Sequence, residues 1–422
     1  MRVDGLGLSS EQKLSKFEIV GAGLIILAFG LLPIGRTVEY PTILMAVGGL
    51  FLLIRNGRGQ ARRRSDVRMF TILFLLYWVP MVVSLFGAEA LTNSAFFTLK
   101  YLRFVFAGYF VLYLSTSKKV RALVLSGLSI AISLWILDSL YQWQTGTDLL
   151  GRTYNGVRLL GPFKHLIMPV FLSIFLPLVL INAKLKWPRC LFWTLFLASL
   201  WVLFLTGSRG SWIALVFGGL LYCAYVFVSQ KKNTLMAIIL IIAGAVGIGT
   251  AGYHYEPGFQ RRIDMTLMVF KGDYDSIDRA SAHRLPIWET ASRMALDNPL
   301  NGVGVKGFMF SYHKYAAPDD PFKAKGASHP HLFLLEVLAE TGTVGLLAML
   351  FSVALVFKLG AENLKKWSPL QAGSAITLAI TFFPLNAHVT LYGSNYSQVA
   401  WLMAAISIAW LYGSDEAEPF NK

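Results

Sequence analysis

Two histidines precede an apolar run near the C-terminal end of the chain, in the stretch SHPHLFLLEVLAETGTVG. An imidazole at a water boundary can accept a proton from a hydroxyl group, which general-base catalysis requires. His331 is the first candidate for such a base, and His329, restrained by Pro330, is the second. The alternative for either residue is a histidine at a helix end that bonds a backbone carbonyl.

Two arginines stand in settings that favour a bound anion. Arg209 lies in the short hairpin TGSRGSW, and Arg284 follows Ser281 in ASAHRLPIW, where we expect a helix over 281–297. A cation in the first turn of a helix opposes the macrodipole, and a bound anion would remove that cost. Both arginines could hold a diphosphate through charge-assisted hydrogen bonds. The alternatives are that Arg209 reaches lipid headgroups and that Arg284 pairs with Glu289 or a nearby aspartate.

The glutamate within the apolar run is expected to have a structural role. A helix that began at His331 would place Glu340 about 180° around its axis from the histidine. An unpaired carboxylate in lipid is costly, so Glu340 should pair with a polar group on another span. Gly342 and Gly345 would neighbour the histidine face of this helix.

Weaker signals come from other polar residues near the apolar runs. Lys100 and Arg103 lie inside one run, and Asn386 and His388 lie near the end of another. Each could serve a functional site or simply reach an interface or a neighbouring helix. Possible substrate contacts are Arg158, Lys164, Ser208 and Trp288.

The composition shows which elements must position these residues. The chain has 422 residues, 55% of them hydrophobic, with a mean hydropathy of +0.56. These values exceed those of soluble domains and predict an all-α polytopic membrane protein. Twelve spans are expected, near 17–35, 38–55, 69–88, 95–115, 121–142, 164–183, 190–207, 211–230, 234–253, 331–358, 369–391 and 395–413.

Charge in the short connections predicts the orientation of the spans. Lysines and arginines cluster in five alternate connections, which the positive-inside rule places in the cytoplasm. Both termini are then cytoplasmic. The predicted organisation is spans one to nine in 1–252, a large outer loop with short helices in 253–330, spans ten to twelve in 331–413, and a tail in 414–422. That loop with its border holds five of the seven histidines.

The three motifs together resemble the O-antigen ligase and polymerase superfamily of bacterial envelope enzymes, and the O-antigen ligases within it (lipid A-core:surface polymer ligases). They are TGSRGSW, HRLPIW followed by NPLNGVGVKGF, and HLFLLEVLAETGTVGLL, in this order. The resemblance implies His331 as the base and Arg209 and Arg284 as diphosphate ligands. Glu340, Gly342 and Gly345 complete the last motif. Family members commonly have His-Asn where this chain has His331-Leu332.

The resemblance also implies a GT-C-like glycosyltransferase of the bacterial inner membrane with a periplasmic active site. Its donor would be O-antigen linked to undecaprenyl diphosphate, its acceptor lipid A-core, and its product lipopolysaccharide. The outer loop has no Asp-rich motif, so we expect inverting transfer without a metal or other cofactor. No nucleic-acid module is evident, and the oligomeric state is not predicted.

Three alternatives stay open. The first is an O-antigen or exopolysaccharide polymerase, whose acceptor is another lipid-linked glycan. The second is a protein O-oligosaccharyltransferase. The third, from a different class, is a transporter of lipid-linked glycans, which would need polar residues along a path through the membrane rather than at one face.

Overall fold

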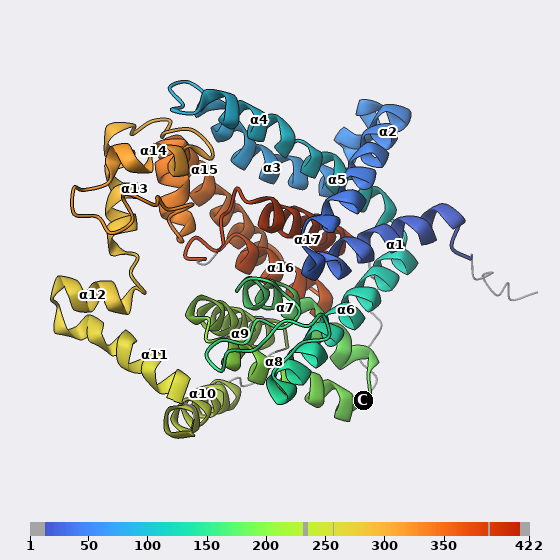
Figure 1. Cartoon of the computed structure of the whole chain (residues 1–422). Helices are drawn as coiled ribbons and strands as arrows, with labels where there is room; N and C mark the ends of the chain where they lie inside the picture. Colours follow the sequence, from blue (N-terminus) through green and yellow to red (C-terminus); the bar gives the residue numbers. More distant parts are fainter. Residues whose placement is uncertain (1–12, 231–234, 256, 387–388, 414–422) are drawn as a thin grey trace, which may run out of the picture.

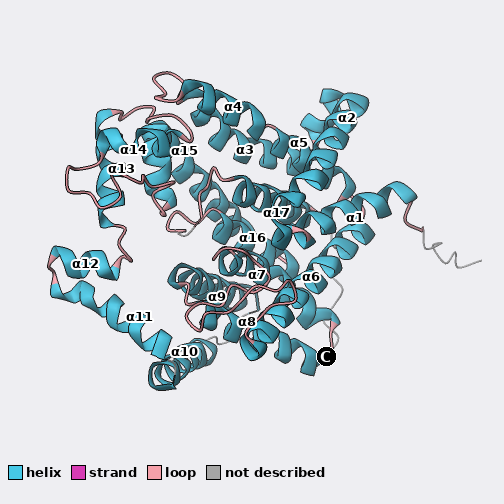
Figure 2. Ribbon diagram, viewed as in Figure 1, coloured by secondary structure: helices cyan, strands magenta, loops and turns pink. Residues whose placement is uncertain are grey.

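The computed structural model describes residues 13–230, 235–255, 257–386 and 389–413. Within these ranges the chain is helical and contains no strand, apart from one isolated bridge between Thr147 and Thr153 (Figure 2). The predicted all-α fold class is therefore confirmed. His388 and the tail after 413 lie outside the described residues.

Seventeen α-helices follow one another along the described chain (Figure 1). They are α1 (Lys16–Gly30), α2 (Glu39–Arg63), α3 (Ser65–Val83), α4 (Leu91–Tyr101), α5 (Arg103–Leu114), α6 (Lys118–Thr145), α7 (Met168–Lys186), α8 (Arg189–Thr206), α9 (Arg209–Gln230), α10 (Leu235–Tyr255), α11 (Pro257–Leu267), α12 (Tyr274–Ala280), α13 (Leu285–Asp297), α14 (Gly307–Tyr315), α15 (Phe333–Asn363), α16 (Pro369–Thr381) and α17 (Ser394–Tyr412).

Eight helical segments of the described chain are long and apolar enough to cross a membrane. This number confirms a polytopic membrane protein but is smaller than the twelve spans expected. The expected spans over 17–35, 234–253, 369–391 and 395–413 have no counterpart among these eight segments of the described chain. The segments are Leu32–Arg55, Ser65–Val83, Leu91–Leu114, Lys118–Thr145, Met168–Lys186, Arg189–Thr206, Arg209–Ser229 and Phe333–Asn363.

Three helices differ from the spans expected from hydropathy. The span expected over 95–115 is divided into α4 and α5 at Leu102. Helix α16 ends at Thr381, ten residues before the expected end at 391, because Pro384 follows closely and cannot continue a helix. Helix α15 is interrupted at Gly342, whose φ of 65° and ψ of −163° are not helical.

The centre of the bundle is an aromatic cluster around Trp401 of α17. Its indole ring packs against Phe74 of α3 at 5.0 Å and against Phe382 at 5.4 Å between ring centroids. Its Nε1 donates a hydrogen bond to the Tyr101 hydroxyl at 2.8 Å. Burial of large rings with satisfied polar tips holds α3, α4 and α17 together.

Helices α11 to α14 form the segment between α10 and α15, and α13 and α14 pack beside α15 (Figure 1). A small separate core, which includes Ile287, Met294, Phe308 and Tyr312, supports this segment. We call residues 257–332 the outer segment. It contains the second motif and the first two residues of the third, so its packing determines where Arg284 and His331 lie.

The outer segment is fixed to α15 at the break in that helix. The Thr343 amide donates to the Pro299 carbonyl at 2.8 Å, and the Val303 amide donates to the Ala339 carbonyl at 2.9 Å. A Cβ at Gly342 would lie 2.3 Å from the Leu300 carbonyl oxygen, so only glycine permits this approach. Gly342 of the third motif thus serves a backbone junction.

Candidate active site

The hairpin between α8 and α9 places Arg209 at the start of α9. Gly207 adopts a φ of 60°, and a Cβ there would lie 1.2 Å from Nη1 of Arg262. The guanidinium of Arg262 therefore occupies the space that any other residue at 207 would fill. This contact joins the hairpin to α11 of the outer segment.

Arg209 itself bonds to the outer segment. Its Nη1 donates to the Thr266 hydroxyl at 2.8 Å and to the Ala280 carbonyl at 2.7 Å. Both partners are neutral, so these bonds orient the guanidinium without cancelling its charge. The second bond ends four residues before Arg284, and so brings the two motifs together.

The turn before α13 differs from the expected helix over 281–297. The helix begins at Leu285, and Ala282 and His283 have φ values of 61° and 58°. Asp278 organises this turn, because its carboxylate accepts from His283 Nδ1 at 2.8 Å and from the Leu285 amide at 3.1 Å. Proline at the second helical position suits a helix that starts here. Arg284 is therefore the N-cap residue rather than part of the first turn.

Arg284 lies in a cluster of positive charge. Burial and the charges of Arg209 and Arg158 lower the pKa of its guanidinium to about 10. Burial disfavours a charged group, and like charges disfavour it further. The structure thus brings together Arg209 and Arg284, as expected for a diphosphate site, and adds Arg158.

The loop between α6 and α7 delivers Arg158 to this cluster. The amide of Leu159 donates to the Leu205 carbonyl at 3.2 Å, and Arg262 donates to the Val157 carbonyl. Both bonds hold the loop against the hairpin and α11. Within the described residues, the Arg158 side chain has no hydrogen-bond or ion-pair partner. An arginine placed beside two others in this way suits an anionic ligand.

His331 lies in the chain just before α15 rather than inside that helix. The helix begins at Phe333, with Leu332 as its N-cap, so the expectation that His331 starts it is wrong. His331 has a φ of 58°, a conformation that non-glycine residues rarely adopt. Its Nδ1 is buried and has no hydrogen-bond partner among the described residues. Strained, unsatisfied groups of this kind are typical of functional sites.

The histidine pair is held by α13. The Trp288 indole donates a hydrogen bond to the Pro330 carbonyl at 3.0 Å, and Pro330 separates the two histidines. The rings of His329 and His331 lie 3.9 Å apart between centroids, and the Ser328 hydroxyl bonds His329 Nδ1 at 2.9 Å. Trp288, expected as a possible substrate contact, thus anchors the loop that carries the base.

Burial, followed by the charge of Arg284, lowers the pKa of His331 to about 4. At neutral pH the imidazole is therefore uncharged and able to accept a proton. The same interaction shows that His331 lies within electrostatic range of the arginine cluster. A proton acceptor can activate a hydroxyl group for attack, and nearby cations can stabilise a phosphorylated leaving group. Such a reaction needs both kinds of group close together.

The two glutamates in the first half of α15, Glu336 and Glu340, are buried and bonded. Glu340 Oε2 accepts from the Lys306 amide at 2.8 Å. Glu336 accepts from the Leu391 amide at 2.9 Å and from the Thr390 hydroxyl. Glu340 therefore supports the outer segment rather than another span, so that expectation is wrong. A Cβ at Gly345 would meet the Thr341 side chain.

The other residues expected near substrate are dispersed. Ser208 is fully buried, and its hydroxyl bonds that of Ser211 at 2.9 Å, whereas Lys164 is exposed. Asn386 is buried and donates to the Ile380 carbonyl at 3.0 Å. Lys100 and Arg103 line a different pocket, described below.

Sequence reasoning missed three residues that shape the site, namely Asp278, Arg262 and Lys306. Asp278 precedes Arg284 by six residues, and a turn-forming aspartate there could have been suspected from the following Ser-Ala-His. No sequence signal links Arg262 to Gly207, because that contact depends on tertiary packing. Among the described residues, no group of three or more His, Cys, Asp and Glu side chains could hold a metal ion.

Comparison with known proteins finds similarity in the part of the chain that holds these residues. Residues 194–350 match the O-antigen ligase family, a range that includes Arg209, Arg284, His331 and Glu340. The chain is also 23% identical to the teichuronic acid biosynthesis protein TuaE of Bacillus subtilis (strain 168) over 393 residues. That similarity covers 88% of this chain and 78% of TuaE. The resemblance expected from the three motifs is confirmed.

Proposed function

We propose that this protein, which carries an O-antigen ligase family domain in an integral membrane fold, transfers a glycan from undecaprenyl diphosphate to a sugar hydroxyl of lipid A-core. The observation that carries the proposal is the position of Arg284, which feels the charges of Arg209 and Arg158 and itself acts on an uncharged His331. Family membership supports glycosyl transfer of the ligase or polymerase type. The choice of donor and acceptor is our inference.

The reaction is a direct displacement at the anomeric carbon. His331 accepts the proton of the acceptor hydroxyl, and the hydroxyl oxygen forms the new glycosidic bond with inversion. The bond from the anomeric carbon to the diphosphate oxygen breaks, and its electron pair leaves with undecaprenyl diphosphate. Arg209 and Arg284, with Arg158 beside them, bind the charge that develops on that group.

The site belongs at the periplasmic face of the inner membrane in this proposal. The basic connections of the chain fall on the opposite side from the outer segment, and both termini share the basic side. A lipid-borne donor and an acceptor sugar in water can meet where the outer segment joins α15. No metal or other cofactor is required, because the donor diphosphate is already a good leaving group.

A polymerase is the second candidate function. The similarity to a teichuronic acid biosynthesis protein favours it, since that name refers to cell-envelope polysaccharide rather than to lipid A-core. In this case the hydroxyl would come from a second lipid-linked glycan. The histidine and the arginines would keep their roles.

One competition experiment separates the two candidates. The purified protein receives lipid-linked O-antigen with equal amounts of lipid A-core and of a second lipid-linked glycan, with and without EDTA. We expect the glycan on lipid A-core in both conditions. Growth of the lipid-linked glycan would instead identify a polymerase, and loss of transfer in EDTA would contradict the metal-independent mechanism. Absence of any transfer with either acceptor would reject the proposal.

The pH dependence of transfer tests the electrostatic link between His331 and Arg284. In the free enzyme the lowered pKa keeps His331 deprotonated, so kcat/KM should hold as pH falls and decline only towards about pH 4. A bound diphosphate offsets the charge of Arg284. The pKa of His331 should therefore be higher in the donor complex than in the free enzyme. The acid limb of kcat, which reports the donor complex, should therefore lie at higher pH.

The variant Arg284→Gln provides the matched control for the pH profile. Removal of the charge should move the acid limb of kcat/KM towards the ordinary histidine pKa of about 6.5. A limb near that value already in the unaltered enzyme would contradict the assignment of His331 as a base with a lowered pKa.

A further inference from the structure

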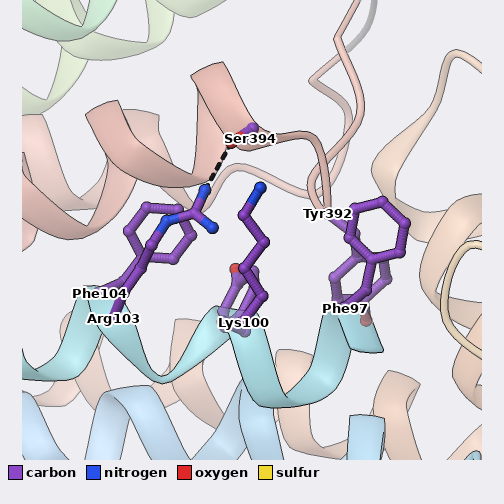
Figure 3. A pocket seen from close by; sticks show the side chains of 7 residues that line it. Phe97, Lys100, Arg103, Phe104, Tyr392 and Ser394 are labelled. Atoms are coloured by element: carbon purple, nitrogen blue, oxygen red, sulfur yellow. Dashed lines mark hydrogen bonds between the residues drawn. The ribbon is translucent and has the colours of Figure 1, made fainter. Parts of the chain in front are cut away.

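A second polar pocket lies apart from the residues of the motifs. It is formed by α4, α5 and the chain that enters α17. Figure 3 shows Lys100 and Arg103 rising from the helices towards Ser394, with Phe97 and Tyr392 at one side and Phe104 at the other. Its lining combines cationic and hydroxyl groups with aromatic walls.

The pocket carries an excess of positive charge. Lys100 Nζ lies 3.7 Å from Glu39 Oε2, and Arg103 Nη2 lies 3.8 Å from Glu39 Oε1. Arg36 also acts electrostatically on Glu39. Lys100, Arg103 and Arg36 thus share one carboxylate. A bound ligand with a single negative charge would still leave these four side chains with a net positive charge. Cations within a membrane helix are costly unless they serve a ligand or a partner.

The donors of these cations are incompletely used. Arg103 Nη2 donates to the Ser394 hydroxyl at 2.5 Å, and Ser394 donates to Glu39 at 2.8 Å. Arg103 Nε is buried and has no hydrogen-bond partner among the described residues. The distances from Glu39 to both cations exceed hydrogen-bond length. A tetrahedral oxyanion could accept from Arg103 and Lys100 together, as phosphate groups commonly do.

The surroundings of the pocket suit a ligand with acyl chains. Phe96 and Leu99 of α4 are 60% and 69% exposed, and Tyr40 and Ile43 of α2 are 70% and 47% exposed. Lys100 is the residue after Leu99, and its side chain is 38% exposed. The charged pocket therefore adjoins apolar surfaces that would face lipid in a membrane, which a soluble phosphate would not use.

We propose that the pocket at Lys100 and Arg103 binds the phosphate group of a membrane phospholipid, with the acyl chains along the exposed faces of α2 and α4. The two cations bind the phosphate oxygens. The Glu39 carboxylate, close to both, offsets part of their mutual repulsion. This site uses none of the residues assigned to glycan transfer. It stands whether the enzyme is a ligase or a polymerase.

Native mass spectrometry of the full-length protein in detergent tests the proposal, with dioleoylphosphatidylglycerol as the probe. We expect one tightly bound lipid, and at least a tenfold weaker Kd in Lys100→Gln and in the double variant with Arg103→Gln. Lys100 is partly exposed, so its variant should fold even if the double variant does not. The matched control is Lys358→Gln, which removes a lysine that pairs with Glu362 at 3.8 Å on α15.

Two further probes distinguish the source of the phosphate. Glycerol 1-phosphate should not displace the lipid at equal concentration, and dioleoylglycerol, which lacks phosphate, should not bind at this site. Displacement by the soluble phosphate would overturn the choice of a lipid, and equal binding of dioleoylglycerol would overturn phosphate recognition. Equal retention by Lys100→Gln and the unaltered protein would reject the site. The Arg209→Ala variant should retain the lipid. Loss of the lipid from this variant would show that the lipid binds at the arginines proposed for the donor diphosphate instead.

Discussion

Replacement of His331 by alanine should abolish glycan transfer while the protein remains folded and inserted. Loss of a general base lowers kcat by about 10²- to 10⁴-fold. The imidazole is the uncharged group beside the arginine cluster, and its Nδ1 has no competing partner in the described chain. The measurement is the turnover of the purified variant with lipid-linked O-antigen and lipid A-core.

Two controls separate chemistry from folding in this experiment. His331→Asn removes the base but keeps a residue that tolerates positive φ, so it should fold and remain inactive. His313→Ala removes another histidine of the outer segment, whose Nδ1 bonds the Lys323 carbonyl at 2.6 Å, and should retain most activity. His329→Ala then tests the neighbouring ring. Normal turnover in His331→Ala would show that His331 is not the base.

Removal of the Arg284 charge should have the second largest effect. Arg284→Ala should lower kcat/KM for the donor by about 10²- to 10³-fold, the usual cost of one group that stabilises a leaving anion. Arg209→Ala should act in the same direction. Arg284→Lys should recover only part of the activity, because an ammonium cannot reproduce bidentate binding. The measurement is donor-dependent kinetics with acceptor saturating.

Arg261→Ala is the matched control for the arginine variants. Arg261 is an exposed arginine of α11, next to the Arg262 that packs on Gly207. It is absent from the groups whose charge lowers the pKa of Arg284. A loss in Arg261→Ala as large as in Arg284→Ala would indicate nonspecific attraction of the donor to positive charge. Unchanged donor affinity in both Arg209→Ala and Arg284→Ala would refute the diphosphate clamp.

The sequence allowed the class of fold to be predicted and the residues of a candidate site to be named, because both depend on local signals. Apolar windows identify membrane helices from length alone. Arg209, Arg284 and His331 each stand in a short motif whose residue types suggest their chemistry. Their proximity, however, rests on contacts between distant segments, such as the bond from Arg209 to the Ala280 carbonyl.

The errors concern helix ends and connections. Hydropathy extends a span as long as apolar residues continue, so it missed the breaks at Leu102 and Gly342. The helix expected from Ser281 starts instead at Leu285, because Asp278 bonds the intervening turn in a conformation that no periodic pattern reveals. In the sequence, Arg158 and Lys164 are equivalent candidates for contact with substrate. Only the packing of the loop shows that Arg158 lies near Arg284 and that Lys164 is exposed.

The arginine cluster has a consequence for turnover. In the proposed donor the diphosphate is esterified at both ends, whereas the released undecaprenyl diphosphate has a free terminal phosphate and carries more negative charge. In their proposed roles, Arg158, Arg209 and Arg284 would therefore hold the product more tightly than the donor. Such an enzyme is inhibited by its own product. Its flux would then depend on a reaction that consumes the released diphosphate.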